Sequence, residues 1–203
     1  MKKLLVFLPA LLLFFAQSGV AQFSVGVSAG TNLSNSIYKG FNYDTEGSVN
    51  YFAEVRPTYS LGKKWAISTG LQYSVKGYQY QSSLPQVVTG AQYHYLDILP
   101  TVEFRLVKWL SIFGGMNTGI RLKERYRVAN KWGTTPMNSM NPVDRGALAG
   151  LKVSYKNFFV SAHYNRSVIS ASEIEFTNEN GVNLPGVKQL NQNVQVGVGY
   201  VFL

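Results

Sequence analysis

The chain has 203 residues, with 19 Lys and Arg against 10 Asp and Glu, and a formal net charge of +9. It contains no cysteine, which excludes disulfides and a lipid-modified cysteine at a mature N-terminus. Its 13 Tyr, 12 Phe and 19 Gly are typical of a β-protein. Because only two histidines are present, far apart in the sequence, we expect no His-based metal site and no cofactor.

The N-terminus has the pattern of a secretory signal peptide. Two lysines precede an apolar run over residues 4–15, and the small residues Gly19 and Ala21 follow. A membrane-spanning helix needs about 20 apolar residues, so this run is too short for one. We predict a cleaved signal peptide at residues 1–21 and a mature domain at 22–203, exported in a Gram-negative cell. The alternative is an N-terminal membrane anchor.

The mature chain contains eight segments in which side chains alternate with a period of two. Such alternation predicts β-strands with one apolar and one polar face. In the last segment the valines, Tyr200 and Phe202 share one face, and Asn, Gln and Gly occupy the other. In chain order, the predicted strands cover residues 23–30, 49–61, 65–76, 96–106, 110–123, 146–155, 158–165 and 193–203.

The connections between these strands alternate long and short. Tight turns are expected at 62–64, 107–108 and 156–157, and long polar connections at about 32–48, 79–91, 126–142 and 168–188. Outer-membrane barrels have short periplasmic turns and long extracellular loops. The sequence therefore predicts an all-β fold, an eight-stranded antiparallel up-and-down transmembrane β-barrel in the cell outer membrane. The alternative is a soluble β-protein whose apolar faces point inward.

Aromatic residues near the strand ends are expected to form two girdles at the membrane interfaces. The lower girdle, beside the short turns, comprises Trp65, Trp109, Tyr155 and Phe158. The upper girdle, beside the long connections, comprises Tyr51, Tyr78, Tyr93 and Tyr126.

Charged residues within the predicted strands share a face with Gly and Ser, which suits a narrow lumen. Together with His163, this predicted luminal set comprises Glu54, Arg56, Lys76, Asp97, Glu103, Arg105, Arg121, Lys123 and Lys152. Eight strands enclose an interior just wide enough for side chains. Because acids and bases are interspersed, they can pair and offset the cost of burial. We predict a packed plug, and the alternative is a small diffusion pore.

His163 raises a third alternative, a lipid A-modifying enzyme. Such a hydrolase would carry His and Ser on the outside of the barrel, facing lipid. Alternation places Ser161 and His163 on the luminal face, and Asn165 stands where the serine would be needed. We therefore expect no catalytic residues and a non-enzymatic protein.

The mature chain resembles the small outer-membrane β-barrel proteins of Bacteroidetes, the porin-family or PorT-like proteins. The resemblance rests on residues 20–22, 23–30 (FSVGVSAG), 95–100 (YLDILP), 164–167 and 197–202. The chain departs from the pattern by ending on Leu203, where such proteins commonly end on an aromatic residue. PorT-like members are associated with secretion across the outer membrane, so the resemblance implies a secretion-associated role.

The expected function is a structural, binding or secretion-associated role carried by the four long extracellular loops. Aromatic residues in or near these loops are candidates for partner contacts: Tyr38, Phe41, Tyr43, Tyr80, Trp132 and Phe176. Removing the two signal-peptide lysines lowers the formal net charge from +9 to +7. Because the protein is expected to be exported, nucleic acid is not expected to be the partner of this excess positive charge. Expected partners are outer-membrane lipid and lipopolysaccharide, the outer-membrane assembly machinery, and a secretion-system or surface protein.

Overall fold

A computed structural model describes residues 23–39, 45–79, 88–128, 131–135, 142–169, 172–177 and 183–202. The predicted signal peptide lies outside these residues. Within them, the chain forms strands β1 (Phe23–Lys39), β2 (Glu46–Leu61), β3 (Trp65–Gln79), β4 (Val88–Val107), β5 (Leu110–Val128), β6 (Lys131–Thr135), β7 (Val143–Tyr155), β8 (Phe158–Ile169), β9 (Ser172–Thr177) and β10 (Asn183–Phe202). In the same ranges, no helix is long and apolar enough to cross a membrane.

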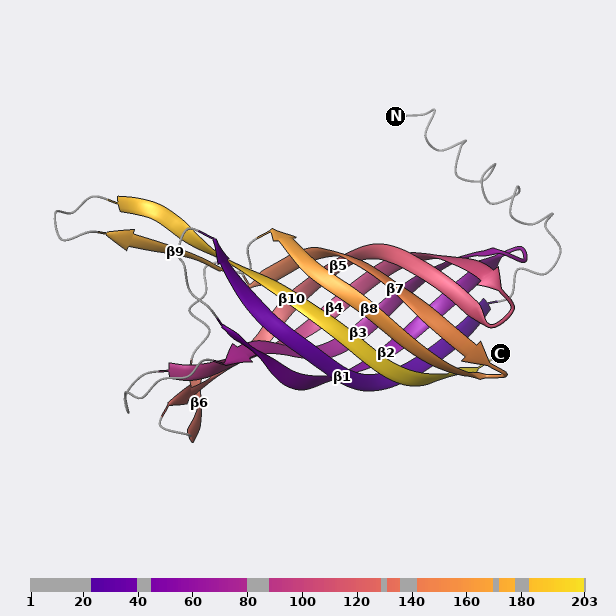
Figure 1. Cartoon of the computed structure of the whole chain (residues 1–203), viewed down its shortest axis with the longest axis horizontal. Coiled ribbons are helices and arrows are strands. Elements are labelled where there is room, and N and C mark those ends of the chain that lie inside the picture. Colours follow the sequence, from indigo (N-terminus) through magenta and orange to yellow (C-terminus); the bar gives the residue numbers. More distant parts are fainter. Residues whose placement is uncertain are drawn as a thin grey trace, which may run out of the picture.

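Eight of these strands close into an antiparallel barrel. The neighbours run β1-β2-β3-β4-β5-β7-β8-β10, and β1 also pairs with β10, which completes the ring (Figure 1). The register places Val25 opposite Phe202, so the start of β1 and the end of β10 lie side by side. The tight turns after β2, β4 and β7 lie at this same end, which we call the short-turn end. The predicted eight-stranded up-and-down barrel is confirmed.

The barrel wall is apolar outside and polar inside. On the outward face of β2, Val49 is 69% exposed and Val55 is 47% exposed. Glu54, on the opposite face of the same strand, is 6% exposed. The same inversion extends around the wall, where the outward valines, leucines and isoleucines are exposed and the inward polar residues are buried. Exposed aromatic residues stand beside the short turns, as predicted for the lower girdle: Trp65, Trp109, Tyr155 and Phe158. This arrangement is the one that a bilayer requires of a spanning barrel.

Several strands are longer than predicted and extend into segments that were expected to be loops. β1 continues through Asn32, Ser34 and Ser36, whose side chains are buried in the interior. β10 begins at Asn183, and two short strands lie inside the predicted third and fourth loops. In β1 the prediction stopped too early because polar residues interrupt the outward face, where Thr31 and Asn35 alternate with Leu33 and Ile37.

The wall continues beyond the barrel at the long-connection end, opposite the short turns. There, β6 pairs with the end of β5, and β9 pairs with the start of β10. Figure 1 shows both short strands projecting past the closed ring. The long connections are therefore built partly on extensions of the barrel strands.

The outer wall supports a prediction about depth. Leu71→Arg, on the outward face of β3, is expected to lower the free energy of unfolding by about 2–4 kcal/mol, because a cation at mid-bilayer depth lies away from water. Val168→Arg is the matched control, since Val168 also faces outward but lies near the long-connection end, and it should cost about 0–1 kcal/mol. Equilibrium unfolding in phospholipid vesicles measures both. Equal costs would contradict a lipid-facing wall.

Candidate functional site

A buried triad of charged groups fills the lumen toward the long-connection end. Lys76 Nζ lies 3.0 Å from Asp97 Oδ1 and 3.1 Å from Asp144 Oδ2, and all three side chains are 1% exposed. Gly119 of β5 lies opposite Asp97 of β4 on one side and opposite Asp144 of β7 on the other. A side chain at Gly119 would overlap the Asp97 carboxylate. The glycine therefore leaves the space in which the Lys76 triad assembles.

Hydrogen bonds and an aromatic ring complete the Lys76 triad. The lysine Nζ lies 4.5 Å from the ring centre of Tyr95. The two carboxylates accept hydrogen bonds from side chains of β3, β8 and β10: Ser74, Ser167 and Asn191. Buried charges are costly unless they are paired and hydrogen-bonded, and here each is.

A second buried ion pair lies beside the triad on β5. Arg121 Nη1 pairs with Glu124, and Arg121 Nε donates to Tyr95 Oη at 3.1 Å. The guanidinium carbon of Arg121 lies 4.7 Å from the ring centre of Tyr93. Tyr93 and Tyr95 thus pack against the cations of the two clusters.

The tyrosines predicted for the upper girdle divide between the two faces of the wall. Tyr78 and Tyr93 are buried in the interior cluster, so their assignment to the girdle was wrong. Tyr126 packs against the same cluster and its hydroxyl donates to Glu124 at 2.9 Å. Tyr51 is exposed on the outer wall, where the girdle was expected.

A β-bulge at Leu122 reverses one predicted side chain. Residues 94 and 95 of β4 pair with Lys123 and Arg121 respectively, so Leu122 is left without an opposing residue. Leu122 and Lys123 are both exposed, whereas Arg121 and Glu124 are both buried. The prediction that Lys123 faces the lumen was wrong, because one extra residue shifts the alternation by one position.

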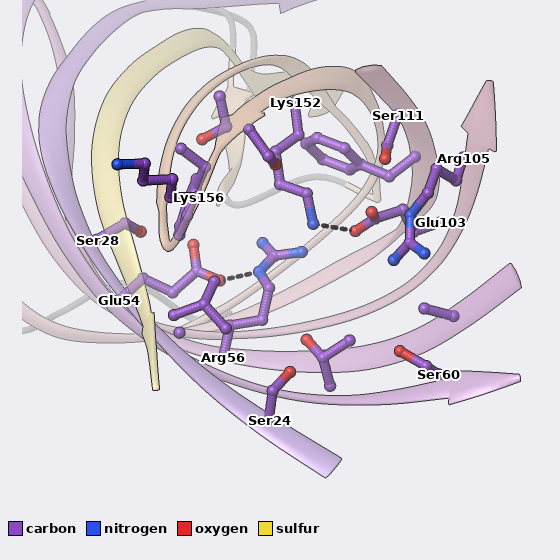
Figure 2. Close-up of a pocket in the computed structure, with 18 of the residues that line it drawn as sticks. Ser24, Ser28, Glu54, Arg56, Ser60, Glu103, Arg105, Ser111, Lys152 and Lys156 are labelled. Atoms are coloured by element: carbon purple, nitrogen blue, oxygen red, sulfur yellow. Dashed lines mark hydrogen bonds and ion pairs between the residues drawn. The ribbon is translucent and has the colours of Figure 1, made fainter. Parts of the chain in front are cut away.

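A cavity of about 250 Å³ occupies the lumen at the short-turn end. Two ion pairs reach into it, Arg56 with Glu54 and Lys152 with Glu103 (Figure 2). Arg56 Nη1 also donates to Thr101 Oγ1 at 3.0 Å. Six serines are among the other residues that line the cavity: Ser24, Ser28, Ser60, Ser111, Ser154 and Ser161.

Arg105 lies at the mouth of this cavity and not in a buried network. It is exposed, and its Nη1 donates to Lys63 O at 3.1 Å. Lys108 and Lys156 line the same mouth and are exposed as well. The short-turn end therefore has a basic, exposed rim.

Side chains from non-adjacent strands fill the lumen between the cavity and the Lys76 triad. Gln72 of β3 and Gln195 of β10 exchange two hydrogen bonds of 3.0 Å. Gln72 Nε2 also lies 3.2 Å from Glu54 Oε2, which links this layer to the cavity. A buried apolar cluster completes the filling: Leu99, Phe113 and Leu148.

His163 is enclosed by this filling. It is 6% exposed, and its ring centre lies 5.9 Å from that of Phe113. Acyl chains of the bilayer contact the outer wall, so they cannot reach this imidazole. Among the described residues, no group of three or more His, Cys, Asp or Glu side chains could hold a metal ion.

The luminal charges nearly cancel. Four cations meet five carboxylates in the ion pairs, which is a formal balance of −1: Arg56, Lys76, Arg121 and Lys152 with Glu54, Asp97, Glu103, Glu124 and Asp144. The sequence reasoning missed Glu124 because strand five was expected to end at Lys123 and the bulge was not foreseen. It missed Asp144 because strand six was expected to begin at Gly146, although the alternation continues back to Val143.

The aromatic loop candidates are only partly described. Tyr38, Trp132 and Phe176 belong to strands β1, β6 and β9, not to loops. The other three lie outside the described residues: Phe41, Tyr43 and Tyr80. Trp132 contacts two cations, since the guanidinium carbons of Arg125 and Arg127 lie 5.7 and 5.9 Å from its ring centre.

A closed eight-stranded barrel with an apolar outer wall and a paired polar lumen defines the class of outer-membrane β-barrels. The family described as "Outer membrane protein beta-barrel domain" matches residues 15–173. The chain therefore belongs to this family, and it is a protein of the outer membrane.

Solved structures of two small barrels have the same fold. Ail, the attachment invasion locus protein of Yersinia pestis, is 14% identical with a TM-score of 0.52, over 89% of this chain and 99% of Ail. Neisserial surface protein A is 12% identical with a TM-score of 0.51, over 88% of this chain and 96% of that protein. At these identities the likeness shows the fold alone. No curated protein matches the chain.

The Lys76 triad supports a prediction about stability. Lys76→Ala leaves two buried carboxylates without their cation and is expected to lower the free energy of unfolding by about 3–5 kcal/mol. Arg105→Ala removes an exposed cation at the cavity mouth and should cost about 1 kcal/mol or less. Urea unfolding of the folded barrel in detergent measures both. A small cost for Lys76→Ala would show that water reaches the triad.

Proposed function

We propose that the protein is a sealed, non-enzymatic barrel that displays binding surfaces on the extracellular side of the outer membrane. The observation that carries this proposal is the filled lumen. The Lys76 triad, the Arg121–Glu124 pair and the Gln72–Gln195 layer occupy it above the cavity. A barrel that does not conduct acts as a support for the connections at its two ends. We therefore assign the function to the surfaces that these connections form.

The long-connection end is the one proposed to carry the extracellular binding surfaces. Family barrels place their long loops outside the cell and their short turns in the periplasm. Here the strands themselves continue past the closed ring, with β6 on β5 and β9 on β10. Hydrogen-bonded extensions of this kind position a binding surface more rigidly than free loops do, which lowers the entropy cost of binding.

The resemblance to PorT-like proteins of Bacteroidetes favours a secretion-system or surface protein as the partner. The cleaved signal peptide at residues 1–21 and recognition by the outer-membrane assembly machinery belong to the same proposal. Ail, which shares the fold, has been crystallised with the heparin analogue sucrose octasulfate. That complex illustrates a barrel of this size binding an anionic ligand, and it supports display as a workable role.

A small diffusion pore is the competing function, and conductance separates the two. The purified protein in planar lipid bilayers is expected to give no steady current, because ion pairs and packed side chains fill the lumen. Lys152→Gln, in the cavity, is expected to leave the bilayer equally silent. Stable wild-type currents whose ion selectivity changes in Lys152→Gln would replace the sealed barrel with a pore.

Orientation is tested by epitope insertion. Tags inserted at residues 134–138 or 178–183 are expected to react with antibody on intact cells, since these connections are proposed to be extracellular. Tags at Lys63 or Asn157, in short turns, should react only after the outer membrane is permeabilised. The opposite pattern would show that the long connections face the periplasm and would overturn display at the cell surface.

A further inference from the structure

A cluster of cations lies on the outer wall where β4, β5 and β6 leave the apolar band. We call it the basic outer patch, and it consists of the cations Lys123, Arg125 and Arg127 together with the adjoining Trp132. The bulge at Leu122 creates it, because the extra residue turns Lys123 and the alternate residues after it outward. Without the bulge, these cations would point into an interior already occupied by tyrosines.

The same bulge separates charges of opposite sign. The carboxylates of β4, β5 and β7 are all buried on the inner face: Asp97, Glu103, Glu124 and Asp144. The outward cations of β5 therefore have no acidic neighbour on the outer face of these three strands. Since the luminal charges nearly cancel, this wall carries an unbalanced positive charge beside the membrane.

The basic outer patch is partly pre-organised. Arg127 Nε donates to Thr89 Oγ1 at 3.2 Å, and its Nη2 donates to Gln79 Oε1 at 3.3 Å. The indole of Trp132, on β6, lies against the guanidinium groups of both arginines, at 5.7 and 5.9 Å. These contacts hold the arginines in place, so less side-chain entropy is lost when they bind a ligand.

The patch borders the lipid-facing band directly. Ile120 and Leu122, the preceding outward residues of β5, are 51% and 52% exposed. Beside them, His94 pairs with Lys123, and the His94 Nδ1 lies 2.6 Å from Tyr73 Oη. An amphiphile whose acyl chains lie on the apolar band would thus bring its head group to the cations.

We propose that the basic outer patch binds the phosphate groups of the phosphorylated glycolipid of the outer leaflet, the lipid anchor of lipopolysaccharide. Guanidinium groups match phosphate oxygens in two-pronged hydrogen bonds, and a lysine adds a point charge. Clusters of Lys and Arg at the edge of an apolar membrane span are typical of sites that bind anionic lipids. The site rests on the proposed orientation, which the epitope tags test independently.

The experiment titrates the purified, folded protein in detergent with diphosphorylated lipid A and follows bound lipid by native mass spectrometry. The double variant Lys123→Gln/Arg125→Gln is expected to bind about thirtyfold more weakly, the product of two separate contributions from cations at a membrane surface. Arg127 is left unchanged because it also links β5 to β3 and β4. Heat-dependent mobility on gels checks that the variant is folded.

The matched control is Lys63→Gln/Lys64→Gln, which removes the same charge from an exposed turn at the opposite end. It should bind lipid A as the wild type does. Dephosphorylated lipid A should bind the wild type as weakly as lipid A binds the patch variant, and phosphatidylglycerol should bind more weakly than lipid A. Undiminished binding by the patch variant, an equal loss in the control, or equal affinity for phosphatidylglycerol would each overturn the proposal.

Discussion

The pairing of β1 with β10 is the constraint on which the rest of the structure depends. In hydrocarbon, every backbone N–H and C=O must be satisfied within the wall, so a spanning sheet has to close. The register from Val25–Phe202 to Lys39–Lys188 closes this one along almost the whole of β1. Closure with eight strands then sets a narrow interior, and that narrowness decides which side chains can lie inside it.

A narrow interior that contains charges must pair them, and the protein does so in two ways. Toward the long-connection end, the Lys76 triad is buried and packs against Tyr95. At the short-turn end, Arg56–Glu54 and Lys152–Glu103 line a cavity whose wall also contains several serines. Buried ion pairs thus lie toward one end of the lumen and a cavity lies at the other, which favours the proposed support for surface-exposed strands over a channel.

The bulge at Leu122 connects the interior to the exterior. One additional residue places Arg121 and Glu124 together inside and turns Lys123 outward. The inner pair stabilises the plug, while the outer cations form the basic outer patch with Trp132. A single local irregularity thus underlies both proposals, the sealed lumen and the lipid-binding patch.

The sequence by itself determined the eight spanning strands, their outward and inward faces and the alternation of short and long connections. Where one face of a strand must contact lipid, the period-two pattern can be read from that segment alone, as in Val194 to Phe202. Only the tertiary structure decided that β1 continues through Asn32 and Ser34, since polar residues interrupt the apolar pattern of its outward face there. It also decided the partners of Lys76 and the side on which Lys123 lies. Those depend on register with neighbouring strands, and one unpaired residue reverses every side chain after it.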